Sequence, residues 1–259
     1  MRKKLYIFCI LITLQTFVGF GDKQDADEQG TNEQSKQSPL VKEADEEKPQ
    51  IKSPDSLLTF KPPMRGVPVT RIGGGVRGPD LNSPILRVIT PQSTGLTLSA
   101  QPILYWFQSK LAPDMQCEFV LNSGEETLVQ ETLEIAKKPG IQKLDLKYLD
   151  VHLEPEVEYE WNIALIPDPQ RRTMDVVASG TIQKVNASEE LMRQLAQADS
   201  VDLPAIYCDA GIWYEAISSL STQIEEDPEN RHLRKVRIGL LDQVGLSAVS
   251  EYEREELEH

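Results

Sequence analysis

Apolar and polar residues alternate along several short stretches between residues 57 and 185. The clearest stretch is 157–165, where every second residue from Tyr159 to Leu165 is apolar or aromatic, and residues 143–148 repeat the pattern. A period of two places one face of a strand in a core and the other in water. Further strands are predicted at 86–89, 96–99, 103–107, 117–121, 127–135 and 176–183. Seven or eight short strands separated by turn residues predict an antiparallel β-sandwich of immunoglobulin or fibronectin type over residues 57–185.

The period changes after Val185. Leu191, Leu195 and Ala198 form one helical face, and Pro204 has the position of a first-turn proline in a second helix. A third helix is predicted after Gly211, and a fourth is predicted to start at Asp227-Pro228 and to end at Gly245. The fold class is therefore mainly β plus α, with a small helical module at 186–249 and a charged, frayed tail at 250–259.

One part of the helical module resembles a single tetratricopeptide repeat. The residues at that repeat's spacings are Leu203, Tyr207, Ala216, Leu220 and Pro228. A solenoid needs about three or more such units. The likeness therefore predicts one helical hairpin and no repeat array.

The N-terminal region has the composition of an export signal followed by a tether. Residues 1–21 combine the cations Arg2, Lys3 and Lys4 with an apolar run and small residues at its end, as a cleaved signal peptide does. The run is shorter than the roughly 20 apolar residues of a membrane span, so no transmembrane span is expected after cleavage. Residues 22–56 are polar and charged, which predicts a disordered acidic tether. We expect an exported, periplasmic or extracellular protein.

Net charge and cysteine content limit which partners, disulfides and metal sites the chain can have. Cleavage of residues 1–21 removes three cations and no anions, so the formal charge falls from −14 to −17. Such a chain repels phosphate backbones, which excludes nucleic acid as a partner. Cys117 and Cys208 remain, and either a disulfide or two separate buried thiols fits their patterns. Neither has a second cysteine at short spacing, so no metal site is expected.

A glycine-rich stretch at 73–78 matches the dinucleotide fingerprint G-x-G-x-x-G in its letters. Prolines follow where the fingerprint needs a helix, so no cofactor is predicted. A structural turn is favoured; the alternative is a loop in which Arg71 and Arg77 meet an anionic ligand. The sequence has no H-E-x-x-H and no G-x-S-x-G motif. A two-carboxylate hydrolase site stays a minor alternative, and the chain is expected not to be an enzyme.

The three tryptophans differ in their suitability as binding residues. Trp161 alternates like a core residue, whereas Trp106, between Tyr105 and Phe107, is open to a second role in stacking on a sugar. Trp213 and Tyr214 follow Gly211 near the edge of an apolar helical face. They are predicted to contact another helix or a partner protein.

Three short blocks carry a family resemblance. They are residues 71–78, the segment 153–161 that ends in Glu-Tyr-Glu-Trp, and Ala-Gly-Ile-Trp-Tyr at 210–214. In order and spacing the chain resembles, from Arg71 to Leu246, the exported bacterial family called domain of unknown function 928. One departure is Phe107-Gln108, where the family has an aromatic-proline pair. The resemblance implies a bacterial cell-envelope protein and brings no activity, ligand or catalytic residue.

These observations favour a non-enzymatic protein–protein interaction with an envelope partner through the helical face around Trp213 and Tyr214. The alternative is a glycan-binding β-sandwich that uses Trp106 or Tyr105. An envelope hydrolase is the less favoured third reading.

Overall fold

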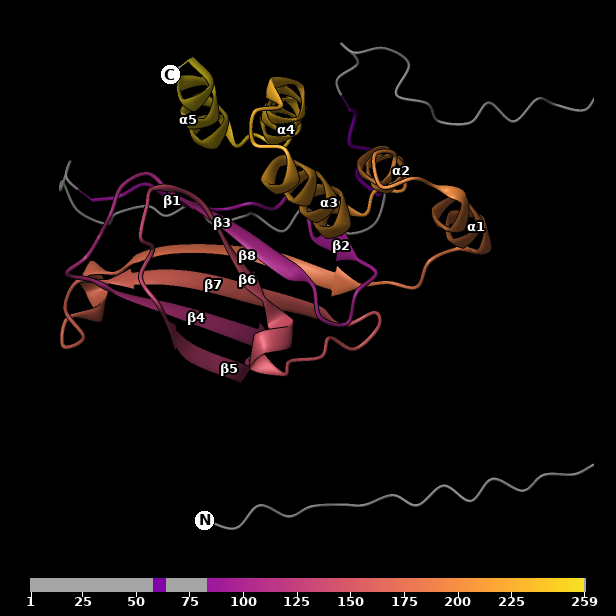
Figure 1. Ribbon diagram of the computed structural model, residues 1–259. Helices are drawn as coiled ribbons and strands as arrows, with labels where there is room; N and C mark the ends of the chain where they lie inside the picture. Colours follow the sequence, from indigo (N-terminus) through magenta and orange to yellow (C-terminus); the bar gives the residue numbers. More distant parts are fainter. Residues whose placement is uncertain (1–57, 64–82, 259) are drawn as a thin grey trace, which may run out of the picture. The chain divides into compact units, whose positions relative to one another are not determined.

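The computed structural model describes residues 58–63 and 83–258, which belong to one compact unit (Figure 1). The predicted signal peptide, the tether and the loop that carries Arg71 and Arg77 lie outside the described residues. Among the residues described, no helix has both the length and the apolar character needed to cross a membrane.

In the part of the chain that the structure describes, eight strands form two sheets and helices follow them, which confirms the mixed β-then-α class. The strands are β1 (Leu86–Val88), β2 (Gly95–Thr97), β3 (Ile103–Gln108), β4 (Gln116–Ser123), β5 (Glu126–Leu133), β6 (Gly140–Asp145), β7 (Glu158–Ile166) and β8 (Val176–Lys184). One sheet has the order β1-β3-β6 and the other β2-β8-β7-β4-β5. All pairs are antiparallel except β2 with β8, which is parallel. Strands β6 and β5 therefore lie at sheet edges.

The predicted strand at 143–148 ends earlier than its alternation suggested. Strand β6 stops at Asp145, whose carboxylate accepts a hydrogen bond from the Lys147 N–H at 2.9 Å. This cap starts a 3₁₀ helix, η1 (Leu146–Leu149). Leu146 is consequently buried, whereas Tyr148 is 85 % exposed. The chain therefore follows the local cap made by Asp145 and turns into a 3₁₀ helix, although the period-two pattern predicted a longer strand.

Five helices follow the strands: α1 (Glu189–Gln197), α2 (Leu203–Asp209), α3 (Trp213–Glu226), α4 (Arg231–Gln243) and α5 (Ser247–Glu258). The first four confirm the predicted helices, with Pro204 in the first turn of α2 and positive φ at Gly211 and Gly245. The start of α4 differs from the prediction. Asn230 caps it by accepting from the Leu233 N–H at 3.3 Å, and Asp227 belongs to the end of α3.

The charged tail predicted at 250–259 is wrong for residues 250–258, which continue α5. Val249 and Ser250 are fully buried, and Glu253 is 7 % exposed. Burial of Glu253 is possible because Arg237 of α4 forms a bidentate ion pair with its carboxylate. The high charge of this segment predicted a solvated tail, whereas the segment is a helix whose inner face packs on the rest of the chain.

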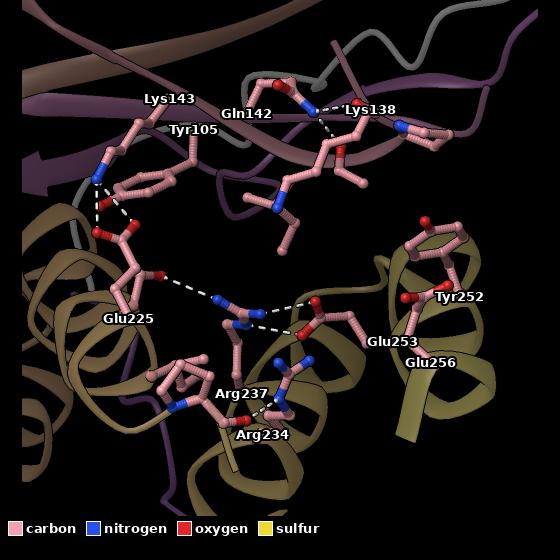
Figure 2. Close-up of a pocket in the computed structure, with 16 residues that line it drawn as sticks. Tyr105, Lys138, Gln142, Lys143, Glu225, Arg234, Arg237, Tyr252, Glu253 and Glu256 are labelled. Atoms are coloured by element: carbon pink, nitrogen blue, oxygen red, sulfur yellow. Dashed lines mark hydrogen bonds and ion pairs between the residues drawn. The ribbon is translucent and has the colours of Figure 1, made fainter. Parts of the chain in front are cut away.

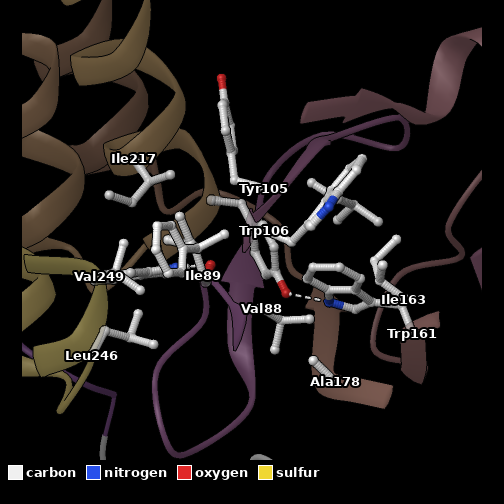
Figure 3. Packing of buried hydrophobic residues seen from close by; sticks show 14 of the residues in the cluster. Val88, Ile89, Tyr105, Trp106, Trp161, Ile163, Ala178, Ile217, Leu246 and Val249 are labelled. Atoms are coloured by element: carbon white, nitrogen blue, oxygen red, sulfur yellow. Dashed lines mark hydrogen bonds between the residues drawn. The ribbon is translucent and has the colours of Figure 1, made fainter. Parts of the chain in front are cut away.

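Strands and helices share one hydrophobic core (Figure 3). Its strand side includes Trp161 and Ala178, and its helix side includes Ile217, Leu246 and Val249. The division at 185/186 therefore separates strands from helices without separating two cores. A smaller cluster joins β2, α1, α2 and the start of α3 through Leu96, Val185, Leu191, Ile206 and Ile212.

Candidate functional site

A groove of about 660 Å³ lies between the edge strand β6 and helices α3, α4 and α5 (Figure 2). We call it the β6 groove. Its lining residues are Tyr105, Lys138, Pro139, Gly140, Ile141, Gln142, Lys143, Ser221, Ile224, Glu225, Pro228, Arg234, Arg237, Tyr252, Glu253 and Glu256. Strand and helix residues more than 80 positions apart thus face a common space.

The strand wall begins at a turn that the sequence sets locally. Gly140 has a φ of +108°, and a Cβ there would lie 3.5 Å from the Tyr252 ring of α5. The Gln142 side-chain amide donates to the carbonyls of Lys138 and Gly140, at 3.0 and 3.2 Å. Because β6 pairs only with β3, alternate backbone N–H and C=O groups of this edge strand point away from the sheet.

Two ion pairs tie the walls together. The Lys143 ammonium donates to both carboxylate oxygens of Glu225 at 2.8 and 2.7 Å, linking β6 to α3. The hydrogen bonds to Glu225 raise the pKa of Lys143. Arg237 donates from Nε and Nη2 to the two oxygens of Glu253, both at 2.7 Å, linking α4 to α5. Arg237 and Glu253 are each 7 % exposed, so this second pair is part of the interior.

Two further cations line the groove without such a partner. Among the described residues, neither Lys138 nor Arg234 has a carboxylate within ion-pair distance; Arg234 Nε donates to the Pro228 carbonyl at 3.1 Å. The lining contains four Lys or Arg side chains and three Glu side chains, a net charge of +1 on a chain of −14. The groove is a locally cationic region of an acidic protein.

Two tyrosines line the groove and a third lies close to it. The Tyr105 hydroxyl lies 3.5 Å from Ser218 Oγ, and burial raises the pKa of Tyr105. Tyr252 packs edge-on against Phe107 with ring centroids 5.1 Å apart, and burial, followed by Glu256, raises its pKa. Tyr148 follows β6 on η1, and its phenol is near enough to Lys143 to raise the pKa of that ammonium.

The aromatic residues predicted as partner contacts lie inside the protein. Trp213 and Tyr214 are 0 and 1 % exposed, and Trp106 is 5 % exposed. Trp213 Nε1 donates to the Ile89 carbonyl at 3.0 Å, so the start of α3 is fixed to the end of β1. The expected contact surface around Trp213 and Tyr214 is thus wrong: their hydrogen bonds and their packing hold α3 on the strands. Trp106 is likewise not available to stack on a sugar.

The two cysteines are separate buried thiols, on β4 and α2. Burial raises the pKa of Cys117 to about 11, and burial followed by Asp209 raises that of Cys208 to about 12. Both therefore stay protonated at neutral pH. Within the described part of the chain, no three His, Cys, Asp or Glu side chains are grouped as metal ligands would be.

Of the residues that line the β6 groove, the sequence singled out Tyr105 alone, as a residue that could bind a glycan. One signal was available: Arg237 lies among the apolar residues Val236, Leu240 and Leu241 of α4. A charge within an apolar helical face needs a buried partner. That partner, Glu253, belongs to a segment which composition alone assigned to solvent.

The chain belongs to the family described as Domain of Unknown Function (DUF928), whose model matches residues 72–254. No curated protein matches the sequence. One solved structure with some likeness is the crystal structure of an engineered protein at 1.98 Å from the Northeast Structural Genomics Consortium, with 6 % identity and a TM-score of 0.28. The match covers 40 % of this chain and 20 % of that one, so the chain spans about a fifth of that protein.

Proposed function

We propose that this protein is an exported, non-enzymatic interaction protein of the bacterial cell envelope, and that it holds a partner protein in the β6 groove. The observation that carries the proposal is the combination of an edge strand with two cations, Lys138 and Arg234, that no carboxylate of the described chain neutralises. The export signal pattern of residues 1–21 supports the location.

The edge strand supplies the sequence-independent part of the binding. An extended segment that aligns beside β6 would pair with its outward N–H and C=O groups. Strand β6 spans six residues, Gly140–Asp145, and every second one directs its N–H and C=O away from β3, where they are available for such pairing. The helices opposite then provide side-chain contacts.

The cations supply the specificity. A partner segment that carries Asp or Glu would meet Lys138 from the strand side and Arg234 from the helix side (Figure 2). Lys143 and Arg237 are already paired, so they stabilise the walls of the groove without needing the partner. We therefore expect an acidic, extended partner segment.

Tyr148 extends this surface. Its side chain is 85 % exposed next to the end of β6, and tyrosine is enriched among residues that dominate protein interfaces. The rings of Trp106 and Tyr105 are 5 and 3 % exposed, so neither ring offers the open face that stacking on a sugar requires.

We also propose a specific type for the two-sheet fold. Two sheets with mainly antiparallel pairing support an immunoglobulin or fibronectin type of sandwich, and the parallel β2–β8 pair is a departure from it. The α2–α3 pair, joined at Gly211, is consistent with one tetratricopeptide-like hairpin.

The test is affinity capture from an envelope extract of the native organism, with three full-length baits. The wild type is compared with Lys138→Glu/Arg234→Glu and with Lys137→Glu/Lys235→Glu. The control pair lies one position away on each element, is exposed, does not line the groove and changes the net charge equally. We expect the groove variant to lose the partner and the control to keep it. Equal capture by all three baits would contradict the proposal.

A further inference from the structure

The hydrogen-bond register of β6 determines which of its backbone groups point away from the sheet. The Leu146 N–H donates to the Pro102 carbonyl at 3.2 Å, just beyond the end of the β3–β6 ladder. Hydrogen-bonded pairs recur at every second position of an antiparallel ladder. On β6 these positions are Gly140, Gln142 and Leu144. Ile141 and Lys143 therefore direct both N–H and C=O to the open edge, where no strand of the described chain pairs with them.

The other side of β3 supports this assignment. The Ile89 N–H of the segment after β1 donates to the Tyr105 carbonyl at 2.8 Å, so the backbone of Tyr105 bonds toward β1. Tyr105 is the residue of β3 that lies opposite Lys143. Because each residue of a central strand bonds to one neighbour only, Lys143 has no backbone partner on β3.

The side chains of Ile141 and Lys143 lie on the helix side of β6. Lys143 pairs with Glu225 of α3. Phe107, which lies opposite Ile141 on β3, packs against Tyr252 of α5. Directly opposed residues of neighbouring strands point to the same face of a sheet. In a strand added beside β6, the two residues opposite Ile141 and Lys143 therefore point into the β6 groove, and the residue between them points to the other face.

The cations of the groove lie on the walls that these two inward side chains meet. Lys138 precedes β6 on the strand wall, and Arg234 belongs to the helix wall (Figure 2). The inward positions are two residues apart, which is about 7 Å along a strand. Acidic side chains at both positions enter the cationic groove, whereas an acidic side chain between them does not.

We infer that the segment held in the β6 groove is a β-strand that pairs with β6 through Ile141 and Lys143 and carries acidic residues at positions i and i+2. The backbone bonds align the strand, and the two acids bind Lys138 and Arg234. This inference rests on the proposed function and adds to it the register and the sequence pattern of the partner. A glycan or a lipid headgroup lacks the alternating N–H and C=O groups that the edge of β6 matches.

The first test measures amide hydrogen exchange of the full chain, residue by residue, by NMR. The probe is the capped peptide Ser-Thr-Glu-Thr-Glu-Thr-Ser, at about ten times its Kd. We expect exchange at Ile141 and Lys143 to slow about tenfold. The amides of Gln142 and Leu144, already bonded to β3, should change far less. A bound probe that leaves exchange at Ile141 and Lys143 unchanged overturns the strand pairing.

A matched peptide tests the alternation of the acids. Ser-Thr-Thr-Glu-Glu-Thr-Ser has the same composition, but one of its two adjacent acids must point away from the groove. We expect it to bind about two- to fivefold more weakly than the probe, as the loss of one exposed ion pair implies. Equal affinities of the two peptides would overturn the i, i+2 pattern.

The second test removes one outward donor. Ile141→Pro deletes an N–H that does not belong to the β3–β6 ladder, and proline is tolerated at such edge positions. We expect this variant to fold by circular dichroism and to bind the probe about tenfold more weakly, while Ile141→Val binds as wild type does. If Ile141→Pro does not fold, the exchange measurement decides, because it needs no variant.

Lys138→Glu/Arg234→Glu separates this inference from the proposed function. Loss of the probe from this variant but not from folded Ile141→Pro would overturn the strand pairing and leave a cationic partner groove in place. Equal binding of the probe by wild type and all variants would contradict both. A probe that does not bind wild type overturns the strand pattern, whereas the capture of the native partner still tests the proposed function by itself.

Discussion

The Trp161 indole N–H donates a hydrogen bond to the Tyr214 hydroxyl at 2.8 Å, and both side chains are buried. The bond joins β7 to the first turn of α3. The same hydroxyl lies 3.2 Å from the Thr181 carbonyl of β8, to which it donates. One phenol thus connects two strands to the helical part of the chain, and removal of the helices after Val185 would expose the shared core.

Tyr214→Phe tests this link. The ring stays in place, but the Trp161 N–H and the Thr181 carbonyl lose their partner inside the protein. We expect the free energy of unfolding to fall by about 1–3 kcal/mol, measured by urea denaturation. Tyr148→Phe, at an 85 % exposed site, is the control and should stay within about 0.5 kcal/mol of wild type. An unchanged midpoint for Tyr214→Phe would show that the bond adds nothing to stability.

Gly180 of β8 lies close to Val88 and Thr90, at the end of β1 in the other sheet. A Cβ there would lie 2.4 Å from Thr90 Cγ2 and 3.1 Å from Val88 Cγ2. Gly180→Ala is expected to cost about 1–3 kcal/mol by overpacking. Thr90→Ser in the same chain removes the nearer methyl group and should recover part of that loss in a double-mutant cycle. Additive losses in the two variants would argue against this contact.

The buried pair Arg237–Glu253 predicts unequal effects of single and double substitution. Arg237→Ala leaves the Glu253 carboxylate buried without its partner, and we expect a loss of about 3–5 kcal/mol in the free energy of unfolding. Arg237→Met/Glu253→Leu removes both charges and should be less damaging than Arg237→Ala. Thermal and urea unfolding of the two variants would decide this. A double variant as unstable as the single one would contradict it.

The order of strands and helices could be predicted from the sequence because periodicity reports which face of an element is buried. The alternation at 157–165 and the glycines at 211 and 245 correspond to β7 and to two helix ends. Those features depend on neighbours in the chain, which a single sequence displays.

The candidate site could not be predicted, because it depends on pairs that are distant in sequence. Lys143 meets Glu225 across 82 positions, and Arg237 meets Glu253 in a segment whose charge suggested solvent. For Trp213 and Tyr214 the sequence predicted exposure where the structure shows burial. Aromatic rings beside a glycine are typical of a contact surface, yet these two rings fill the space between the strands and α3. Composition does not say whether a ring is covered by the rest of the chain.

Glu215 makes stability depend on pH. Burial raises the pKa of Glu215, although its Oε1 accepts from Thr97 Oγ1, Leu98 N–H and Ser99 N–H at 2.7, 3.0 and 3.0 Å. The folded chain therefore holds this proton more tightly than the unfolded chain does. The resulting stabilisation is complete below the unfolded pKa and is lost as pH rises through the folded pKa.

Glu215→Gln removes this titration. As pH rises above the ordinary glutamate pKa of about 4.3, the stability of wild type relative to Glu215→Gln should fall, as measured by chemical denaturation at each pH. Glu226→Gln, exposed on the same helix, should show no such trend. A pH-independent difference between wild type and Glu215→Gln would mean that Glu215 does not carry the effect.

A partner protein that occupies the β6 groove should be detectable by site-specific photo-crosslinking in the living cell. A photoreactive amino acid is placed at Gln142 on β6. The matched control has it at Leu128, a 44 % exposed residue of β5, which is an edge strand of the second sheet. We predict a crosslinked protein at Gln142 that Lys138→Glu/Arg234→Glu abolishes, and none at Leu128. Crosslinks confined to Leu128, or absent from Gln142 in a folded chain, would contradict the account.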